Sequence, residues 1–366
     1  MDPLAHTLVG ASLAATRLKD STSLAVPALI LGANAPDVDA VTMFIDRDLS
    51  LWFRRGWTHG VLAMVVLPIA LTLLLLFVDR VASHVRGKRP KARAGPLLGL
   101  SMLAVVSHPL LDWLNTYGVR FLMPFDGTWF YGDALFIIDP WIWLVLGTST
   151  VLAFSASTIG AAVWVVLGVL TTLLVSGSDA APLTIRGLWG CGVAAIVWLR
   201  LNKSCHHEVP RLANTCLMAS FGYVALMVGL SELAVRQAGG WLAKRHIAAE
   251  EIMASPAPGN PFRRDILVAA DGRYHFLEVN WLGGETIRVT HPSIERGPEG
   301  AVTRAALAAP HVKGLATWSR FPAYRVEERA DGYRVSISDV RYTRRVGSGL
   351  GAAVVELDRN LRVRSP

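Results

Sequence analysis

Uncharged apolar runs dominate the first two thirds of the chain and predict helices that cross a membrane. Residues 60–78, GVLAMVVLPIALTLLLLFV, contain no charged side chain and are long enough to span a bilayer core of about 30 Å. The stretch 140–178 is also uncharged and is long enough for two spans that turn near 155–157. The remaining expected spans cover about 96–116, 184–201 and 212–231. This pattern is typical of a protein that crosses the membrane several times.

Two apolar segments near the N-terminus are too short for full spans. Residues 4–16 and 23–35 are apolar, and Arg17, Lys19 and Asp20 separate them. We expect a helical hairpin that enters the membrane as two half-helices. Together with the longer runs, it predicts an α-helical integral membrane domain of about six to seven membrane helices or half-helices over residues 1–235.

The character of the sequence changes after residue 235. The stretch 236–261 contains SPAPGNP, whose Pro and Gly content predicts a linker. Beyond it, short alternating runs lie beside Asp271-Gly272 and Asp331-Gly332, which are typical hairpin turns. Residues 262–366 therefore predict a small β-rich domain outside the membrane.

Composition supports the membrane class and gives the net charge a simple explanation. Of 366 residues, 52% are hydrophobic and 17% are charged, and the mean hydropathy is +0.40. The net charge of +8 is best assigned to basic loops that fix topology and face anionic lipid, so we expect no nucleic acid partner. Basic residues crowd 80–93, which predicts a cytoplasmic loop and places the C-terminal domain on the outer side.

Ionisable residues inside the apolar segments carry the strongest functional signal. His108 and Asp112 lie within LLGLSMLAVVSHPLLDWLNTYG, four positions apart and so on one face of a helix. An ionisable side chain in such a helix costs about 2.5–3.5 kcal/mol on insertion scales, so it needs a partner or a function. A metal ion would supply both. A neutral His108 hydrogen-bonded to Asp112 is the structural alternative.

Three further motifs could complete a metal site. In Asn34-Ala-Pro-Asp37-Val-Asp39 the two acids could ligate or bridge ions, or could instead cap a turn. In Arg55-Gly-Trp-Thr-His59 the histidine begins a span at its outer end, where it could also be an interface residue. The expected metal ligands are His6, Asp37, His59, His108 and Asp112, with Asp39 as bridging ligand or base and Arg55 as anion-binding group.

These motifs occur in an order that resembles a known family. DPLAHTLVGASLA, APDVD, RGWTH, SHPLLDWLNTYGVRFLMPF and FIIDP are similar to the YdjM family of membrane-bound metal-dependent hydrolases, over roughly residues 1–145. The resemblance implies an integral protein of the bacterial cytoplasmic (inner) membrane with metal-dependent hydrolase activity. The order of the motifs is also similar to that of zinc-dependent phospholipase C, which implies zinc at the five expected ligands. The further His-x-x-x-Glu pair of that enzyme is missing after Asp112, so one or two ions are expected.

The function that we expect is hydrolysis by metal-activated water. Mixed nitrogen and oxygen ligands suit zinc, with manganese or iron as alternatives. A divalent ion lowers the pKa of bound water from 15.7 to about 7. A site near one membrane face favours a membrane lipid or a lipid-linked (phospho)ester as substrate.

Two other function classes stay open on the sequence. The chain could be a non-enzymatic membrane scaffold or stress-response partner whose C-terminal domain binds a protein. It could also be an ion or proton transporter, although 140–178 offers almost no polar residues for a path to the opposite face.

Overall fold

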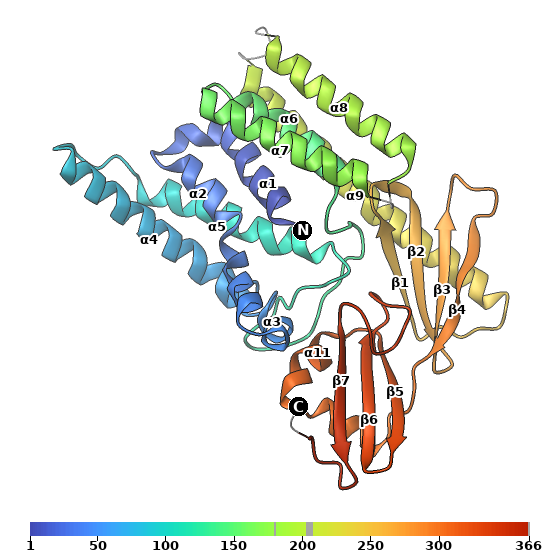
Figure 1. Cartoon of the computed structure of the whole chain (residues 1–366). Coiled ribbons are helices and arrows are strands. Elements are labelled where there is room, and N and C mark those ends of the chain that lie inside the picture. The colour runs from blue at the N-terminus through green and yellow to red at the C-terminus, as the bar shows by residue number, and fades with distance from the viewer. Residues whose placement is uncertain (179–180, 203–207, 365–366) are drawn as a thin grey trace. The chain divides into compact units, whose positions relative to one another are not determined.

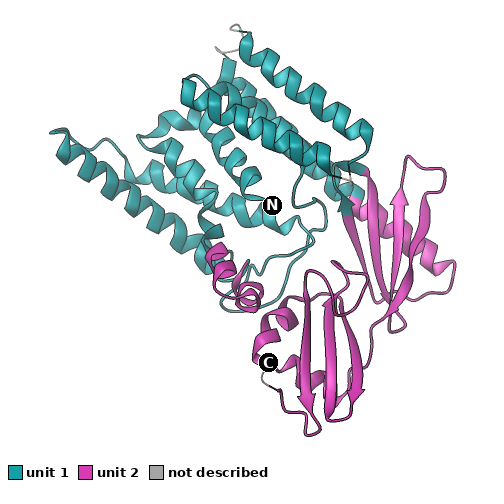
Figure 2. Cartoon of the chain, in the orientation of Figure 1, with its two compact units in different colours: residues 1–38, 55–230, 256–261 teal, residues 39–54, 231–255, 262–366 magenta. Residues whose placement is uncertain are grey.

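The chain forms two compact units, each assembled from distant parts of the sequence. The computed structural model describes residues 1–178, 181–202 and 208–364. The first unit contains residues 1–38, 55–230 and 256–261, and the second contains 39–54, 231–255 and 262–366 (Figure 2).

The first unit is helical, as the apolar pattern predicted. Its helices are α1 (Pro3–Ala15), α2 (Ala25–Gly32), α4 (Val61–Val85), α5 (Ala94–Trp113), α6 (Pro140–Phe154), α7 (Thr158–Gly177), α8 (Leu183–Leu201) and most of α9 (Val209–Ala243) (Figure 1). Among the described residues, α4, α5, α7, α8 and α9 are long and apolar enough to cross a membrane, whereas α1 and α6 are apolar but shorter.

The N-terminal segments form the expected hairpin. Asp2 caps α1 by accepting hydrogen bonds from the backbone N–H groups of Leu4 and Ala5, and a 3₁₀ turn at Arg17–Ser21 leads to α2. The two helices approach closely because residue 10 is glycine. A Cβ there would overlap the carbonyl oxygen of Leu29.

The second unit contains two antiparallel sheets, which confirms the β-rich C-terminal region. The first has the order β1 (Glu251–Ala257), β2 (Asn260–Ala270), β3 (Arg273–Asn280) and β4 (Ile287–Glu295), and the second has β5 (Pro322–Arg329), β6 (Gly332–Asp339) and β7 (Ala352–Asp358). Short helices α10 (Ala301–Leu307) and α11 (Lys313–Trp318) connect them. Asp271 and Gly272, both with positive φ, form the two-residue turn between β2 and β3.

The expected linker is wrong, because 236–261 is largely ordered secondary structure. Helix α9 continues to Ala243, β1 begins at Glu251, and SPAPGNP forms the end of β1, a turn and the start of β2. Pro256 is accommodated because β1 is an edge strand, where an N–H group is not needed. Gly259 has a φ of 65° and closes the turn. The linker prediction failed because Pro and Gly are common both in linkers and in hairpin turns, so composition does not distinguish the two.

The four-stranded sheet is covered on both faces. One face packs on the C-terminal part of α9, where Ala234, Ala238 and Leu242 join Ile266 and Val268 in a buried cluster. The other face packs towards the second sheet, and that cluster contains Met253, Leu267, Phe276, Phe321 and Val340. The second unit therefore has a core of its own.

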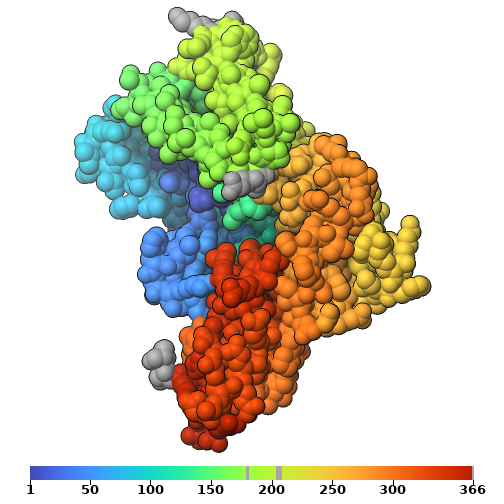
Figure 3. Space-filling view, turned by 45° about the vertical axis from the view of Figure 1, so that its right-hand side comes forward, coloured from blue at the N-terminus to red at the C-terminus, as the bar shows by residue number. Residues whose placement is uncertain are grey.

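A short N-terminal segment also belongs to the second unit. Residues 39–54, which include α3 (Arg47–Phe53), pack against α11. Figure 3 shows the blue surface of this segment beside the orange and red C-terminal part of the same unit. Nothing in the local sequence pattern of 39–54 predicted this association.

Candidate metal centre

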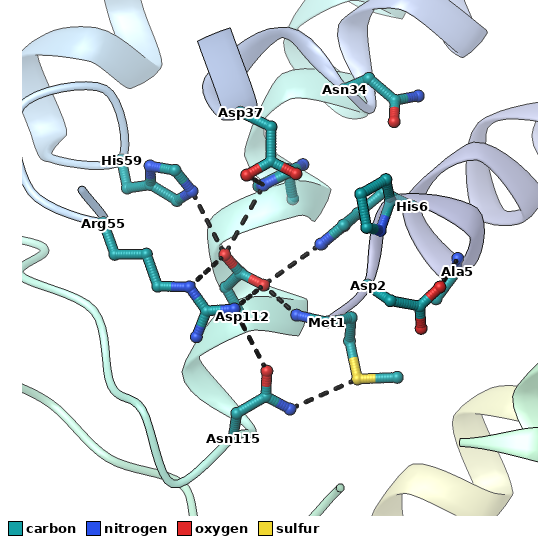
Figure 4. Close-up of polar contacts among 12 residues, drawn as sticks. Met1, Asp2, Ala5, His6, Asn34, Asp37, Arg55, His59, Asp112 and Asn115 are labelled. Carbon is teal, nitrogen blue, oxygen red and sulfur yellow. Dashed lines mark hydrogen bonds and ion pairs between the residues drawn. The ribbon is translucent and has the colours of Figure 1, made fainter. Parts of the chain in front are cut away.

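Three elements of the first unit bring the predicted ligands together. Asp37 lies in a 3₁₀ helix (Ala35–Phe44), His59 lies just before α4, and His108 and Asp112 lie one turn apart on α5 (Figure 4). Each offers one ligand atom, and these four atoms all lie within 4.8 Å of one another. The group could therefore hold a metal ion.

The four residues are almost completely shielded. His59 and His108 are 0% exposed and Asp112 is 1% exposed, whereas the side chain of Asp37 is 18% exposed. Burial alone would raise the pKa of Asp37, but the neighbouring His108 lowers it to about 2. Asp37 is therefore ionised, as a metal ligand must be, and it is the accessible member of the group.

The Asp112 carboxylate is the centre of the arrangement. Its Oδ1 lies 3.2 Å from His6 Nε2, and its Oδ2 lies 3.2 Å from His59 Nε2 and 3.6 Å from His108 Nε2. The amino group of Met1 contacts the same carboxylate (Figure 4). Three imidazole Nε2 atoms thus point at one acid.

The outer nitrogens of two imidazoles are held by neighbouring groups. His108 Nδ1 lies 2.6 Å from the carbonyl oxygen of Ala33, which can only accept a hydrogen bond, so Nδ1 carries the proton and Nε2 of the neutral ring has a lone pair. His59 Nδ1 lies 2.9 Å from Thr58 Oγ1. Partners of this kind commonly orient histidine ligands of metal ions. No sequence pattern indicated Ala33 as the partner of His108, because the contact is made by a backbone carbonyl.

One buried ligand atom is suited to bind a cation. Within the described part of the chain, His108 Nε2 is buried and makes no hydrogen bond, and the nearest carboxylate oxygens of Asp37 and Asp112 lie 3.6 Å away. Buried polar atoms are nearly always satisfied, so such exceptions commonly mark a functional site or a bound ion. The donor set of two imidazoles and two carboxylates also suits zinc, manganese or iron.

His6 lies at the edge of this group. Its ring stacks on that of His108, with centroids 3.6 Å apart and planes at 14°. Its Nε2 faces Asp112 Oδ1, while His59 and His108 face Oδ2. The structure therefore brings all five expected ligand residues together, with His6 against His108 and facing the other oxygen of Asp112.

The structure gives Arg55 and Asp39 specific partners. Arg55 Nε lies 3.0 Å from Asp112 Oδ2 and its Nη2 lies 3.0 Å from Oδ1, a bidentate pair. The Arg55 guanidinium also lies 4.6 Å above the ring of Tyr117. Asp39 is 1% exposed, and its carboxylate lies 3.4 Å from Arg54 Nε. The catalytic roles expected for Asp39 and Arg55 stay predictions.

Other histidines do not extend the site among the described residues. Within the described part of the chain, the potential ligand atoms that lie this close together belong to Asp37, His59, His108 and Asp112. His206 and His207 lie outside the described residues.

Comparisons with known proteins agree with the motif order. The sequence profile of the YdjM inner membrane protein family matches residues 1–183. The Uncharacterized protein YfhP of Bacillus subtilis (strain 168) is 27% identical over 156 residues, which cover 39% of this chain and 43% of that protein. The match therefore spans less than half of that relative. No solved structure matches the chain significantly.

Proposed function

The chain belongs to the YdjM inner membrane protein family, and on that premise we propose that it is a membrane-embedded metal-dependent hydrolase. Its substrate would be a membrane lipid or a lipid-linked (phospho)ester. The site would hold one or two divalent ions, with zinc favoured by the mixed imidazole and carboxylate ligands. The single observation that carries the proposal is the convergence of Asp37, His59, His108 and Asp112 on one buried point.

The expected ligands would coordinate the ion together. Asp37, His59, His108 and Asp112 form the group, and His6 would ligate from the other side of Asp112. A carboxylate that faces histidines on both oxygens is suited to bridge two ions. The bound ion would activate water as a nucleophile near neutral pH and polarise the ester.

The surrounding residues would keep this site in one geometry. The Ala33 carbonyl fixes the ring of His108, and the bidentate Arg55 fixes the plane of the Asp112 carboxylate. Arg55 would also offer positive charge to an anionic group of the substrate, since guanidinium matches phosphate geometry. Asp39 pairs with Arg54, and its expected role as a bridging ligand or a base stays a prediction.

The location of the site argues for a lipid. His108 and Asp112 lie on α5, one of the helices apolar enough to cross a membrane. A substrate with an ester near the headgroup could present it to the exposed edge of Asp37 without leaving the bilayer. By the charge of the loop at 80–93, the site would face the outer side.

Metal content is the first test. Elemental mass spectrometry of the detergent-purified full-length protein should find near-stoichiometric zinc, manganese or iron. The double variant His108→Ala/Asp112→Ala should lose it, because two of the four converging ligands are removed. As a matched control, His84→Ala/Asp20→Ala removes the same side-chain types at exposed positions and should retain the metal. Equal trace metal in all three proteins would refute the metal site.

Substrate class is the second test. Metal-loaded protein should release a water-soluble headgroup or a fatty acid from vesicles of bacterial phospholipids, and the double variant should not. Loaded protein that leaves every lipid class intact would contradict the lipid-ester assignment.

A further inference from the structure

One segment interrupts the site in sequence and belongs to the other unit. Asp37 precedes residues 39–54, and Arg55 and His59 follow them. The flanking residues are part of the first unit, whereas 39–54 is part of the second (Figure 2). The chain therefore leaves the candidate site, joins the unit that contains the C-terminal sheets, and returns to the site.

The two ends of this segment are tied together. Asp39 Oδ1 lies 3.4 Å from Arg54 Nε, and Thr42 Oγ1 donates a hydrogen bond of 2.6 Å to the carbonyl oxygen of Asp39. Asp39 is buried, so its carboxylate is shielded from water. The pair therefore brings the two ends of the 39–54 segment together.

The middle of the segment is anchored to a helix near the C-terminus. Asp48 Oδ2 accepts a 2.7 Å hydrogen bond from the backbone N–H of Gly314, and Oδ1 accepts one of 2.9 Å from that of Leu315. These N–H groups belong to the first turn of α11, where they have no partner within the helix. The carboxylate therefore satisfies two groups that would otherwise depend on water.

Gly314 is required for this fit. A Cβ at residue 314 would overlap the backbone oxygen of Asp48. The contact thus depends on a specific residue from each side, although the two residues are 266 positions apart in the sequence. A loose surface contact would tolerate a side chain at residue 314, whereas this contact requires glycine.

We propose that Asp48 and Gly314 are positioning residues for the metal site. By holding the 39–54 segment, the second unit fixes the point at which the chain leaves the first unit and the point at which it returns, and so fixes Asp37, Arg55 and His59. An unanchored segment would sample many conformations, and ordering it on metal binding would cost conformational entropy. The C-terminal region is then part of the machinery that preorganises the site. This inference rests on the metal site of the proposed function.

Two single substitutions, one on each side of the contact, test the idea in the full-length protein. Asp48→Ala removes both hydrogen bonds, and Gly314→Ala introduces the overlapping Cβ. Zinc affinity, measured by competition with a chelator, should fall about tenfold in each variant, as it does when groups that support metal ligands are altered. Hydrogen exchange should accelerate in residues 35–60 of both.

The matched control is Asp358→Ala. Asp358 also accepts two backbone hydrogen bonds in the second unit, each of 2.8 Å, from Asn360 and Arg362. This variant should keep wild-type zinc affinity and wild-type exchange at 35–60. If Asp48→Ala disturbs exchange of the sheets as well, Asp48→Asn, which keeps one acceptor oxygen, replaces it.

The two readouts separate this inference from the proposed function. Faster exchange at 35–60 with unchanged zinc affinity would overturn the positioning role, as would unchanged exchange in both variants. If the wild-type protein binds no metal, the proposed function fails and this inference fails with it. Zinc bound by the wild type with the same affinity in both variants would overturn this inference alone.

Discussion

At the scale of single residues, three buried aspartates are paired with arginines close in sequence or in space. Asp112 has Arg55, Asp39 has Arg54, and Asp339 has Arg341. Such a partner offsets the cost of removing an ionised carboxylate from water, which is several kcal/mol per charge. Asp112 differs from the other two, because three imidazoles also face it. These additional imidazoles distinguish a candidate metal site from a structural ion pair.

Asp339 provides a test of the structural kind of pair. It is 0% exposed, receives Arg341 Nη2 at 2.8 Å, and accepts backbone hydrogen bonds from Arg320 and Arg341. Asp339→Asn leaves Arg341 buried without a counter-charge, so the second unit should lose about 3–5 kcal/mol of unfolding free energy. The loss is measured by chemical denaturation of the full-length protein in detergent, followed by hydrogen exchange of strands β5–β7. Asp331→Asn, in an exposed pair with Arg364, should change stability little.

The same residue predicts a dependence on pH. Burial alone would raise the pKa of Asp339, but Arg341 and the hydrogen bonds hold it below its ordinary value of 3.8. Stabilisation from Asp339 is therefore complete above pH 3.8 and is lost as the pH falls through the lower folded value. Stability of β5–β7, followed by hydrogen exchange, should decline over this acid range in the wild type. The Asp339→Asn variant should show a shallower decline, and equal slopes would contradict the assignment.

At the scale of elements, α9 has two different surroundings along its length. Its first part, up to residue 230, belongs to the helical unit, and its last part lies under the four-stranded sheet. Small side chains allow the close approach: Ala234 and Ala238 are 0% exposed. A single helix with two kinds of surroundings explains why the apolar pattern ended near residue 231 while the helix did not.

Overfilling this helix–sheet contact should destabilise the second unit. Ala238→Leu adds volume to a fully buried position, so unfolding free energy should fall by about 1–3 kcal/mol. Ala243→Leu, at an exposed position of the same helix, is the control and should have little effect. Exchange protection of β2 and β3 is the measurement. Equal protection in Ala238→Leu and wild type would show that the contact is loosely packed.

At the scale of the whole molecule, family membership and the five helices among the described residues that are long and apolar enough to cross a membrane support a membrane protein. The loop between α4 and α5 and the second unit should lie on opposite sides of the membrane, because basic loops stay in the cytoplasm. This orientation decides which leaflet supplies a lipid substrate to the proposed site.

Cysteine labelling tests the orientation. With Cys191, Cys205 and Cys216 replaced by Ala, single cysteines are introduced as Lys88→Cys in the loop and Ser348→Cys in the second unit. A membrane-impermeant maleimide should label Ser348→Cys in intact spheroplasts, and Lys88→Cys only after the membrane is disrupted. The reverse pattern would place the site on the cytoplasmic side.

Local features of the sequence predicted what depends on neighbours in the chain. Apolar runs predicted the helical class and the helices long enough to cross a membrane, although α6, expected as a span, is shorter than that. The spacing of His108 and Asp112 placed them on one face of α5, and Asp271-Gly272 formed the expected turn. The ordered motifs also led to the correct family.

Contacts between residues that are distant in the sequence became known from the folded structure alone. It paired Arg55 with Asp112, set the ring of His108 through the carbonyl of Ala33, and turned the expected linker into a hairpin. It also assigned residues 39–54 to the unit that contains the C-terminal sheets, through Asp48 and Gly314. Backbone groups and long-range pairs leave no periodic pattern in the sequence, because the partner of a residue is chosen by packing and not by position in the chain.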